Sequence, residues 1–140
     1  MNHKFYIGQE EQEEKVFHES DVELFAQVSG DKNPLHLNDT YAEKSRFGRK
    51  IVHGILVSSL ISKIIGMKLP GEGSIYLEQN IRFRKPVYVD EKVIVKVTII
   101  EINQNKFTLK TNVYNMDDEC LIEGDAKVLY EEIEKGVTKC

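Results

Sequence analysis

Two residue types are scarce in this 140-residue sequence, which contains no tryptophan and only two cysteines, Cys120 and Cys140. A disulfide framework or a cysteine metal cluster needs more cysteines than this. Cys120 lies in a run that alternates like a strand, so we interpret it as a half-buried strand thiol rather than a nucleophile, which would need a nearby base. We expect no metal site, and the chemistry must come from other side chains.

Excess positive charge and long apolar runs are also missing. The formal net charge is -4, which argues against a nucleic-acid partner, because neutralising phosphates takes clustered Lys and Arg. The most apolar segment, residues 55–69, contains Lys63 and Lys68, and the first fifteen residues hold no apolar run of signal-peptide type. We therefore expect a soluble, cytoplasmic protein that makes no membrane contact.

Size and composition predict one globular domain over residues 1–140. Hydrophobic residues make up 41% of the chain, and no internal repeat or linker-like stretch interrupts it. The acidic cluster Glu10–Glu14 and the polar tail after Glu131 are typical of solvated ends.

The first half of the chain predicts two short helices. Ser20 and Glu23 have the spacing of a capping box, apolar residues then recur at helical intervals, and Gly30 supplies a stop. A second helix is expected to start near Asn38 or Asp39, and residues 16–18 could add an edge strand.

A longer helix and four strands are predicted for the second half. From His53 to Leu69 apolar residues occupy almost every helical face, which indicates a helix buried nearly all round. The runs that follow are rich in Val, Ile, Thr and aromatics, and short separators imply antiparallel pairing; they are Ile75–Phe83, Val93–Ile102, Phe107–Tyr114 and Cys120–Tyr130. The expected class is α+β, a curved antiparallel sheet wrapped around one long central helix. Either tight curvature of the sheet or a second subunit is expected to cover the remaining apolar face of the helix.

The densest cluster of reactive residue types runs from Ser29 to Asp39. Asp31 and His36 lie five residues apart, and the Asn33-Pro34 pair between them favours an extended or turning backbone that can bring both side chains to one side. A carboxylate and an imidazole that converge can hold a water, remove its proton and supply a proton elsewhere. Taken singly, Asp31 could form an Asx turn and His36 could be an ordinary loop histidine.

A candidate oxyanion site lies at His53-Gly54, where the long helix begins. The first backbone N–H groups of a helix have no partner within it, its dipole is positive at that end, and glycine allows a ligand oxygen to approach closely. Gly54 N–H is the expected donor. His53 is expected to shape the helix start, with substrate contact as the alternative.

The segment from Phe25 to Ala42, with Gly30, Asp31, Asn33, Pro34 and His36 in register, resembles the hydratase-2 motif of the MaoC-like, R-specific enoyl-CoA hydratases. Residues 51–77 resemble the central helix and following strand of the same family. The resemblance implies a hot-dog fold, a homodimer, catalytic Asp31 and His36, and Gly54 as thioester donor. It further implies that Asn33 orients the loop or water, and that Ser62 is a polar neighbour of the pair. Similar sequences often carry Gly-Asp where this chain has Asp90-Glu91.

The implied activity is reversible hydration of trans-2-enoyl-CoA to the (R)-3-hydroxyacyl-CoA, without a metal or organic cofactor. The alternatives are dehydration of an (R)-3-hydroxyacyl-acyl carrier protein and a non-catalytic acyl-CoA-binding protein. Arg82, Arg84 and Lys85 form a basic cluster at a strand end. It could bind the phosphates of an acyl-CoA substrate, with Arg84 as the expected ligand. Alternatively, it could be a solvated sheet edge that discourages strand addition.

Overall fold

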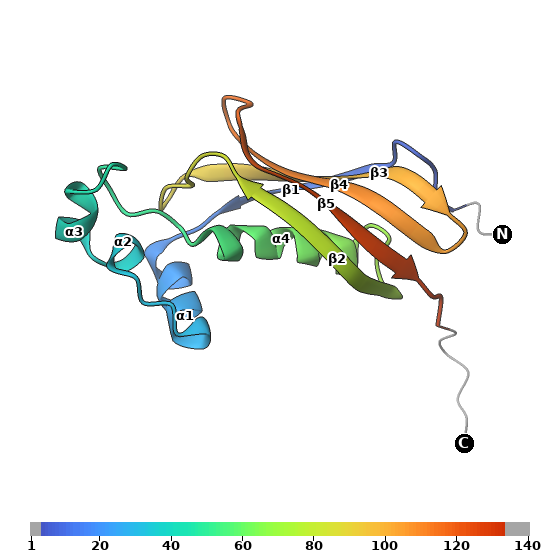
Figure 1. Ribbon diagram of the computed structural model, residues 1–140, viewed down its shortest axis with the longest axis horizontal. Coiled ribbons are helices and arrows are strands. Elements are labelled where there is room, and N and C mark those ends of the chain that lie inside the picture. Colours follow the sequence, from blue (N-terminus) through green and yellow to red (C-terminus); the bar gives the residue numbers. More distant parts are fainter. Residues whose placement is uncertain (1–3, 134–140) are drawn as a thin grey trace, which may run out of the picture.

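The computed structural model describes residues 4–133 and arranges them as five strands and four helices (Figure 1). In chain order these are β1 (Glu10–Val16), α1 (Glu19–Ser29), α2 (Pro34–Leu37), α3 (Asp39–Glu43), α4 (Gly54–Met67), β2 (Ser74–Phe83), β3 (Lys92–Asn103), β4 (Lys106–Asn115) and β5 (Cys120–Tyr130). The four strands expected in the second half are confirmed to within one residue at each end. The short helices α1, α2 and α3 gather at one end of the molecule (Figure 1).

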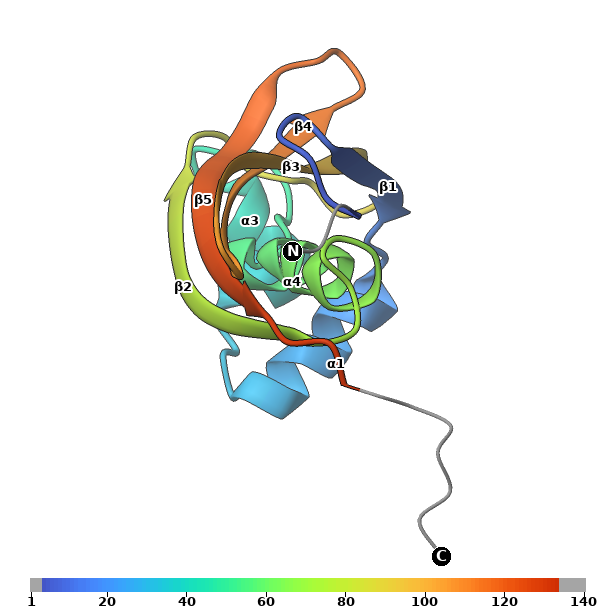
Figure 2. The ribbon, with the colours of Figure 1, turned by 90° about the vertical axis from the view of Figure 1, so that its right-hand side faces the viewer.

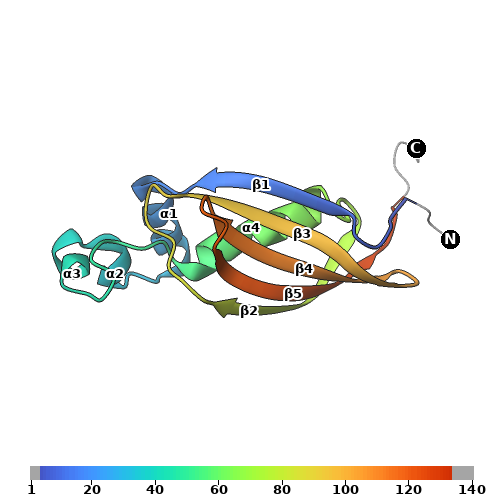
Figure 3. The same cartoon turned by 90° about the horizontal axis from the view of Figure 1, so that it is seen from above.

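The strands form one antiparallel sheet in the order β1-β3-β4-β5-β2, so β1 and β2 are its edges (Figure 3). Seen along its length, the sheet curves around α4 (Figure 2). This confirms the expected α+β architecture. The curvature is helped by register shifts in the β2–β5, β3–β4 and β4–β5 pairings, because an extra residue in one strand bends it.

The core lies between the concave face of the sheet and α4. Alternate residues of β3 from Val93 to Ile99 point inward and are fully buried, as are Ile61 and Ile64 of α4. Truncating one such isoleucine to alanine costs about 2 to 5 kcal/mol in typical cores. This packing holds α4 rigidly, so its N-terminus is a fixed platform.

The prediction that the central helix is buried nearly all round is wrong for the single chain. Ile55 and Met67 of α4 are 59% and 75% exposed, and Ser59, Ser62 and Lys63 also lie on the open face. Five strands cover one side of the helix, which leaves the other side uncovered. None of the helices within residues 4–133 is long and apolar enough to cross a membrane.

The predicted solvated end at Glu10–Glu14 and the edge strand at residues 16–18 are both wrong, because β1 occupies Glu10–Val16. The strand pairs with β3 along its whole length, and Glu13 reaches Lys63 of α4 and Lys68 just after it. Glutamate has a low strand preference, so backbone pairing and this ion-pair link to the helix determine the structure here. The polar tail beyond Ile133, including Cys140, lies outside the described residues.

Between β1 and α4, capping residues determine where the short helices begin and end. α1 starts one residue before Ser20, with His18 as N-cap and the Asp21 carboxylate accepting from His18 N–H, so the predicted Ser20 cap is wrong. Gly30 ends the helix with a φ of 80°, as expected. α2 was not predicted, but Pro34 stands at its first turn, where a missing N–H costs nothing.

Asp90 takes a left-handed conformation, with a φ of 71°, in the turn before β3. The turn keeps its shape because Asp90 N–H donates to Phe17 O and its carboxylate accepts from His18 Nδ1 at 2.7 Å. Asp is one of the few residues other than glycine that visit this region routinely. The turn thus forms without the glycine that similar sequences often carry.

Candidate active site

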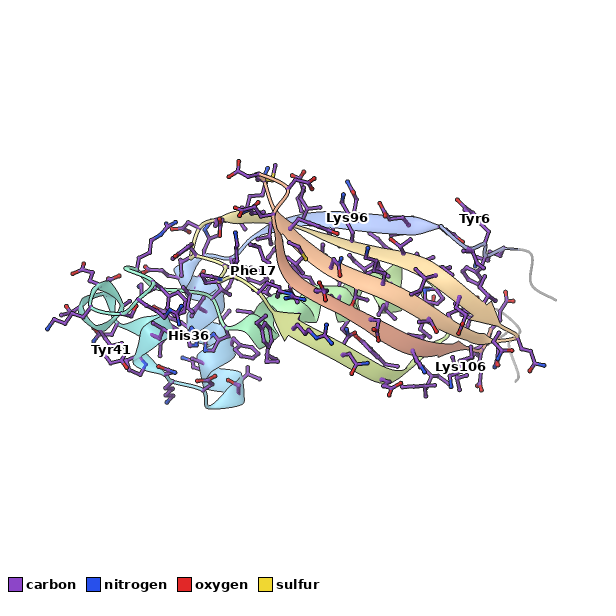
Figure 4. The ribbon with its side chains drawn as sticks, turned by 45° about the horizontal axis from the view of Figure 1, so that its top comes forward. Tyr6, Phe17, His36, Tyr41, Lys96 and Lys106 are labelled. Carbon is purple, nitrogen blue, oxygen red and sulfur yellow. The ribbon has the colours of Figure 1, made fainter. Side chains whose placement is uncertain are left out.

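Three segments meet at the N-terminus of α4 to form the candidate site. The loop after α1 carries Asp31, α2 carries His36, and His53 caps α4. His36, on α2, lies in the helical end of the molecule, far from Lys106 at the start of β4 (Figure 4). Asp31, His36 and His53 each place one polar side-chain atom within 4.8 Å of the others. The predicted pair is therefore brought together, and His53 joins it.

The spacing of Asp31 and His36 suits a bridging water. Two hydrogen bonds of about 2.9 Å meeting at a tetrahedral water oxygen span about 4.7 Å. The two side chains have polar atoms within 4.8 Å of each other, so one water can bridge them by donating a hydrogen bond to each, without any backbone movement. Asp31 is exposed and His36 is half-buried, which opens the bridge to a substrate.

The tautomer of His36 is set by the backbone. Its Nδ1 lies 2.7 Å from Ile51 O, and a carbonyl can only accept, so Nδ1 carries the proton. The neutral ring then has a bare Nε2. Burial lowers the pKa of His36 below 6.5, and nearby His53 adds to the effect, while the bond to Ile51 and the Asp31 charge oppose it. At neutral pH, His36 is therefore an acceptor ready to take a proton.

His53 positions both members of the pair. It is 2% exposed, its Nε2 donates to Asp31 O at 3.0 Å, and its ring stacks on His36 with centroids 3.9 Å apart. Phe25 of α1 packs edge-on against the other side of the ring. Sequence reasoning assigned His53 to the helix start and missed this role. Its only signal was an imidazole directly before the glycine that opens α4.

The three side chains do not form a good metal site, although their types would suit one. The His36 and His53 rings are stacked with an interplanar angle of 28°, an arrangement that disfavours both rings binding one ion in their own planes. His53 Nε2 is also engaged by Asp31 O. The geometry favours acid/base chemistry over metal binding.

Gly54 presents a free donor beside the pair. Among residues 4–133 no acceptor lies on Gly54 N–H, which sits at the positive end of the α4 dipole. A cavity of about 590 Å³ adjoins the helix start, with Gly54 and Ile51 in its wall, whereas Asp31 and His36 lie outside its lining. The Phe83 ring packs so closely that a Cβ on Gly54 would lie 2.5 Å from it. A larger residue at this position would therefore have to displace the Phe83 ring.

Two further predicted residues have different surroundings. Asn33 caps α2, because its side chain accepts from Leu35 N–H at 3.0 Å, while its own N–H donates to Asp31 Oδ1 at 3.3 Å. It therefore shapes the loop that carries Asp31. Ser62 is exposed and lies eight residues along α4 from Gly54, about 12 Å along the axis. Its role beside the pair stays a prediction.

The mouth of the cavity is basic, and two of its three cations, Arg84 and Lys85, have carboxylate partners. Arg46, Arg84 and Lys85 are part of the wall, with Phe83, Val87 and Ile122 as apolar neighbours. Arg82 and Arg84 lie 3.3 and 3.1 Å from Glu123, and Lys85 contacts Glu119. These partners were not anticipated from the sequence, because they come from β5 and the residue just before it, 34 to 41 residues away.

A sheet curved around one helix, with an Asp-His pair at the helix N-terminus, defines the hot-dog class of fold with a hydratase-type site. A family model described as "MaoC like domain" matches residues 7–119. The chain belongs to this MaoC-like family.

Individual relatives agree with the family. The chain is 39% identical over 124 residues to an (R)-specific enoyl-CoA hydratase of Aeromonas caviae, covering 87% of this chain and 92% of that protein. A solved (R)-hydratase from A. caviae, described as involved in PHA biosynthesis, has a TM-score of 0.90 at 36% identity and covers 93% of this chain and 100% of its own. A mitochondrial 3-hydroxyacyl-[acyl-carrier-protein] dehydratase of Arabidopsis thaliana is 34% identical over 128 residues, covering 88% and 76%.

Contact between Gly54 and Phe83 predicts a measurable coupling. Gly54→Ala should destabilise the fold by about 1 to 3 kcal/mol, because the new methyl overlaps the ring. In a Phe83→Ala background the same change should cost nothing or stabilise the helix. Gly66→Ala, on the same helix with open space around it, is the matched control and should stabilise by up to about 1 kcal/mol. Chemical denaturation of the four variants measures this, and equal effects of Gly54→Ala in both backgrounds would contradict the contact.

Proposed function

We propose that this chain catalyses reversible hydration of trans-2-enoyl-CoA to (R)-3-hydroxyacyl-CoA. The observation that carries the proposal is that the Asp31 carboxylate lies within 4.8 Å of a ring nitrogen of His36, whose Nε2 is bare, next to the helix start that carries the free N–H of Gly54. The relatives named as (R)-specific enoyl-CoA hydratases support the substrate and the R configuration. The reaction makes the chain a hydro-lyase.

The proposed mechanism moves one proton through His36. Asp31 and His36 hold the water, His36 Nε2 takes a proton from it, and the oxygen attacks C3 of the substrate. The electron pair of the C2–C3 double bond shifts onto the thioester oxygen, where Gly54 N–H and the α4 dipole stabilise the negative charge. The enolate then collapses as C2 receives the proton from His36. Water and the thioester balance the reaction, so the proposal includes no metal and no organic cofactor.

The rest of the substrate is proposed to occupy the cavity of about 590 Å³. With the thioester oxygen at Gly54, the apolar wall at Phe83 and Ile122 suits a flexible arm, and the cations at the mouth suit its phosphates. Arg84 is the proposed phosphate ligand. Asn33 and His53 act on the substrate through Asp31 and His36, which they position.

A second candidate function is dehydration of an (R)-3-hydroxyacyl-acyl carrier protein, the same chemistry on a protein-borne thioester. The plant relative and the basic mouth favour it. Turnover of one acyl chain on CoA and on a carrier protein separates the two functions.

We also propose a homodimer that pairs at the β2 edge. The two edges of the sheet differ: β1 is rich in glutamate, whereas β2 exposes apolar side chains, with Ile75 and Leu77 42% and 48% exposed. Charged edges resist strand addition, and exposed apolar edges invite it. The uncovered face of α4, with Ile55 and Met67, would be covered by the same contact. In this proposal residues 1–140 form one domain that works in the cytoplasm.

Substitution of either member of the pair tests the mechanism. Asp31→Asn and His36→Ala should each lower the rate of crotonyl-CoA hydration by at least ~100-fold. The His36 change removes the general acid/base, and the Asp31 change removes the negative charge that holds the water and stabilises the protonated His36 ring. Asp39→Asn, an exposed acid eight residues after Asp31, is the control and should keep the parental rate. Loss of the enoyl-thioester absorbance measures all three. A near-normal rate in either catalytic variant would refute the assigned roles.

The pH profile tests the state of His36. Protonation removes the Nε2 lone pair, so kcat/KM should fall as pH drops through the pKa of His36. Because burial holds this pKa below 6.5, the acid limb should have its midpoint below 6.5 and the plateau should extend through pH 7. Crotonyl-CoA hydration between about pH 5 and 8 measures it. A midpoint above 6.5 would show that another group controls the limb or that His36 is not desolvated.

The proposed interface predicts an asymmetry between the sheet edges. Leu77→Lys places a charge on the apolar β2 edge, so it should shift the protein from dimer to monomer. Gln12→Lys makes the matched change on β1 and should leave the dimer intact. Sedimentation velocity at several concentrations measures both. A parental protein that sediments as a monomer, or dissociation only in the β1 variant, would overturn this arrangement.

A further inference from the structure

Two cations at the cavity mouth are held by carboxylates from β5 and from the residue just before it. Glu123 lies 3.3 Å from Arg82 and 3.1 Å from Arg84, and Glu119 contacts Lys85. These contacts hold the pKa of Glu123 and of Glu119 below the usual value, so both are ionised at neutral pH. Arg84 and Lys85 line the cavity, whereas Glu119 and Glu123 do not.

An anion entering the mouth would compete with these carboxylates. A guanidinium has a limited number of donors in one plane, and the oxygen of Glu123 already takes one from Arg84. A phosphate that binds Arg84 in a bidentate manner must displace or share that contact. Arg46, which also lines the cavity, has no carboxylate partner among the described residues and would add a third cation.

We propose that Glu119 and Glu123 are internal competitors for an anion site formed by Arg46, Arg84 and Lys85, which binds the phosphorylated end of a pantetheine thioester. In the empty protein the two carboxylates hold the arginine and lysine side chains at the mouth. On binding, a phosphate group replaces them. The carboxylates therefore keep the site organised but weaken binding of the phosphate-bearing arm. This inference rests on the proposed function, because the thioester end of the same ligand is assigned to Gly54.

Substitution of the two partners of the Arg84–Glu123 ion pair should change the affinity for CoA in opposite directions. Glu123→Gln should tighten CoA binding by about two- to fivefold at low ionic strength, the scale of one exposed ion pair, and Arg84→Gln should weaken it by a similar factor. In the Arg84→Gln background, Glu123→Gln should have a smaller effect, because part of the competition has been removed. Glu119→Gln should act like Glu123→Gln through Lys85. All of these effects should shrink as salt screens the charges.

Titration calorimetry with CoA and with pantetheine, which lacks phosphate, makes the measurement independent of catalysis. Pantetheine affinity should be unchanged in every variant. Glu78→Gln is the matched control, because Glu78 pairs with Lys127 at 3.9 Å on the same two strands but away from the mouth. It should leave the affinity for CoA unchanged.

Two results would overturn the inference: unchanged or weaker CoA binding in Glu123→Gln, or an equal gain for pantetheine. Steady-state turnover distinguishes failure of the proposed anion site from failure of the proposed catalytic function. If crotonyl-CoA is hydrated but its KM is unchanged in Glu123→Gln, only the anion site fails; if neither crotonyl-CoA nor crotonyl-pantetheine is hydrated, the proposed function fails. A lower KM for both CoA and carrier-protein thioesters assigns the site to the phosphate that they share. A lower KM for CoA alone assigns it to the nucleotide phosphates.

Discussion

The candidate site depends on one hydrogen bond, from His36 Nδ1 to Ile51 O at 2.7 Å. Ile51 is fixed by the sheet side of the molecule, because it bridges to Tyr88 and its neighbour Val52 donates to Val87 O at 2.7 Å. The short helices are thereby tied to a rigid strand connection. The bond fixes both the place of the imidazole and its tautomer, and so determines which nitrogen faces a ligand.

His53 extends this constraint to Asp31. It is the last residue before α4, and the buried face of that helix packs against the sheet, so its imidazole is held by the core. Through one hydrogen bond and one ring contact it locates the Asp31 backbone and the His36 ring relative to Gly54 N–H. Acid/base chemistry and oxyanion stabilisation require this mutual placement more than they require any single side chain. The low pKa of His36 follows from the same burial.

The sequence predicted those parts of the fold whose local pattern agrees with their environment. The four apolar strands and the buried face of α4 carry period-two or helical patterns, and Asp31 and His36 lie in one short motif. β1 was not predicted because its glutamates have a low strand preference. It is stabilised by pairing with β3 and by the contact between Glu13 and Lys63 of α4. α2 was not predicted because the Asn33-Pro34 pair is equally typical of a turn and of a helix start.

The parts of the site that depend on distant partners could not be predicted from spacing. His53 meets Asp31 across 22 residues, and Arg84 meets Glu123 across 39. The open face of α4 also contradicts the apolar pattern of its sequence, because pattern reveals how apolar a helix is and not what covers it.

The most direct test of the account is an experimental structure with bound (R)-3-hydroxybutyryl-CoA. The account predicts the thioester oxygen within about 3.1 Å of Gly54 N, and the 3-hydroxyl in hydrogen-bond contact with both the Asp31 carboxylate and His36 Nε2. A thioester bound away from the α4 N-terminus, or a hydroxyl out of reach of either side chain, would contradict it.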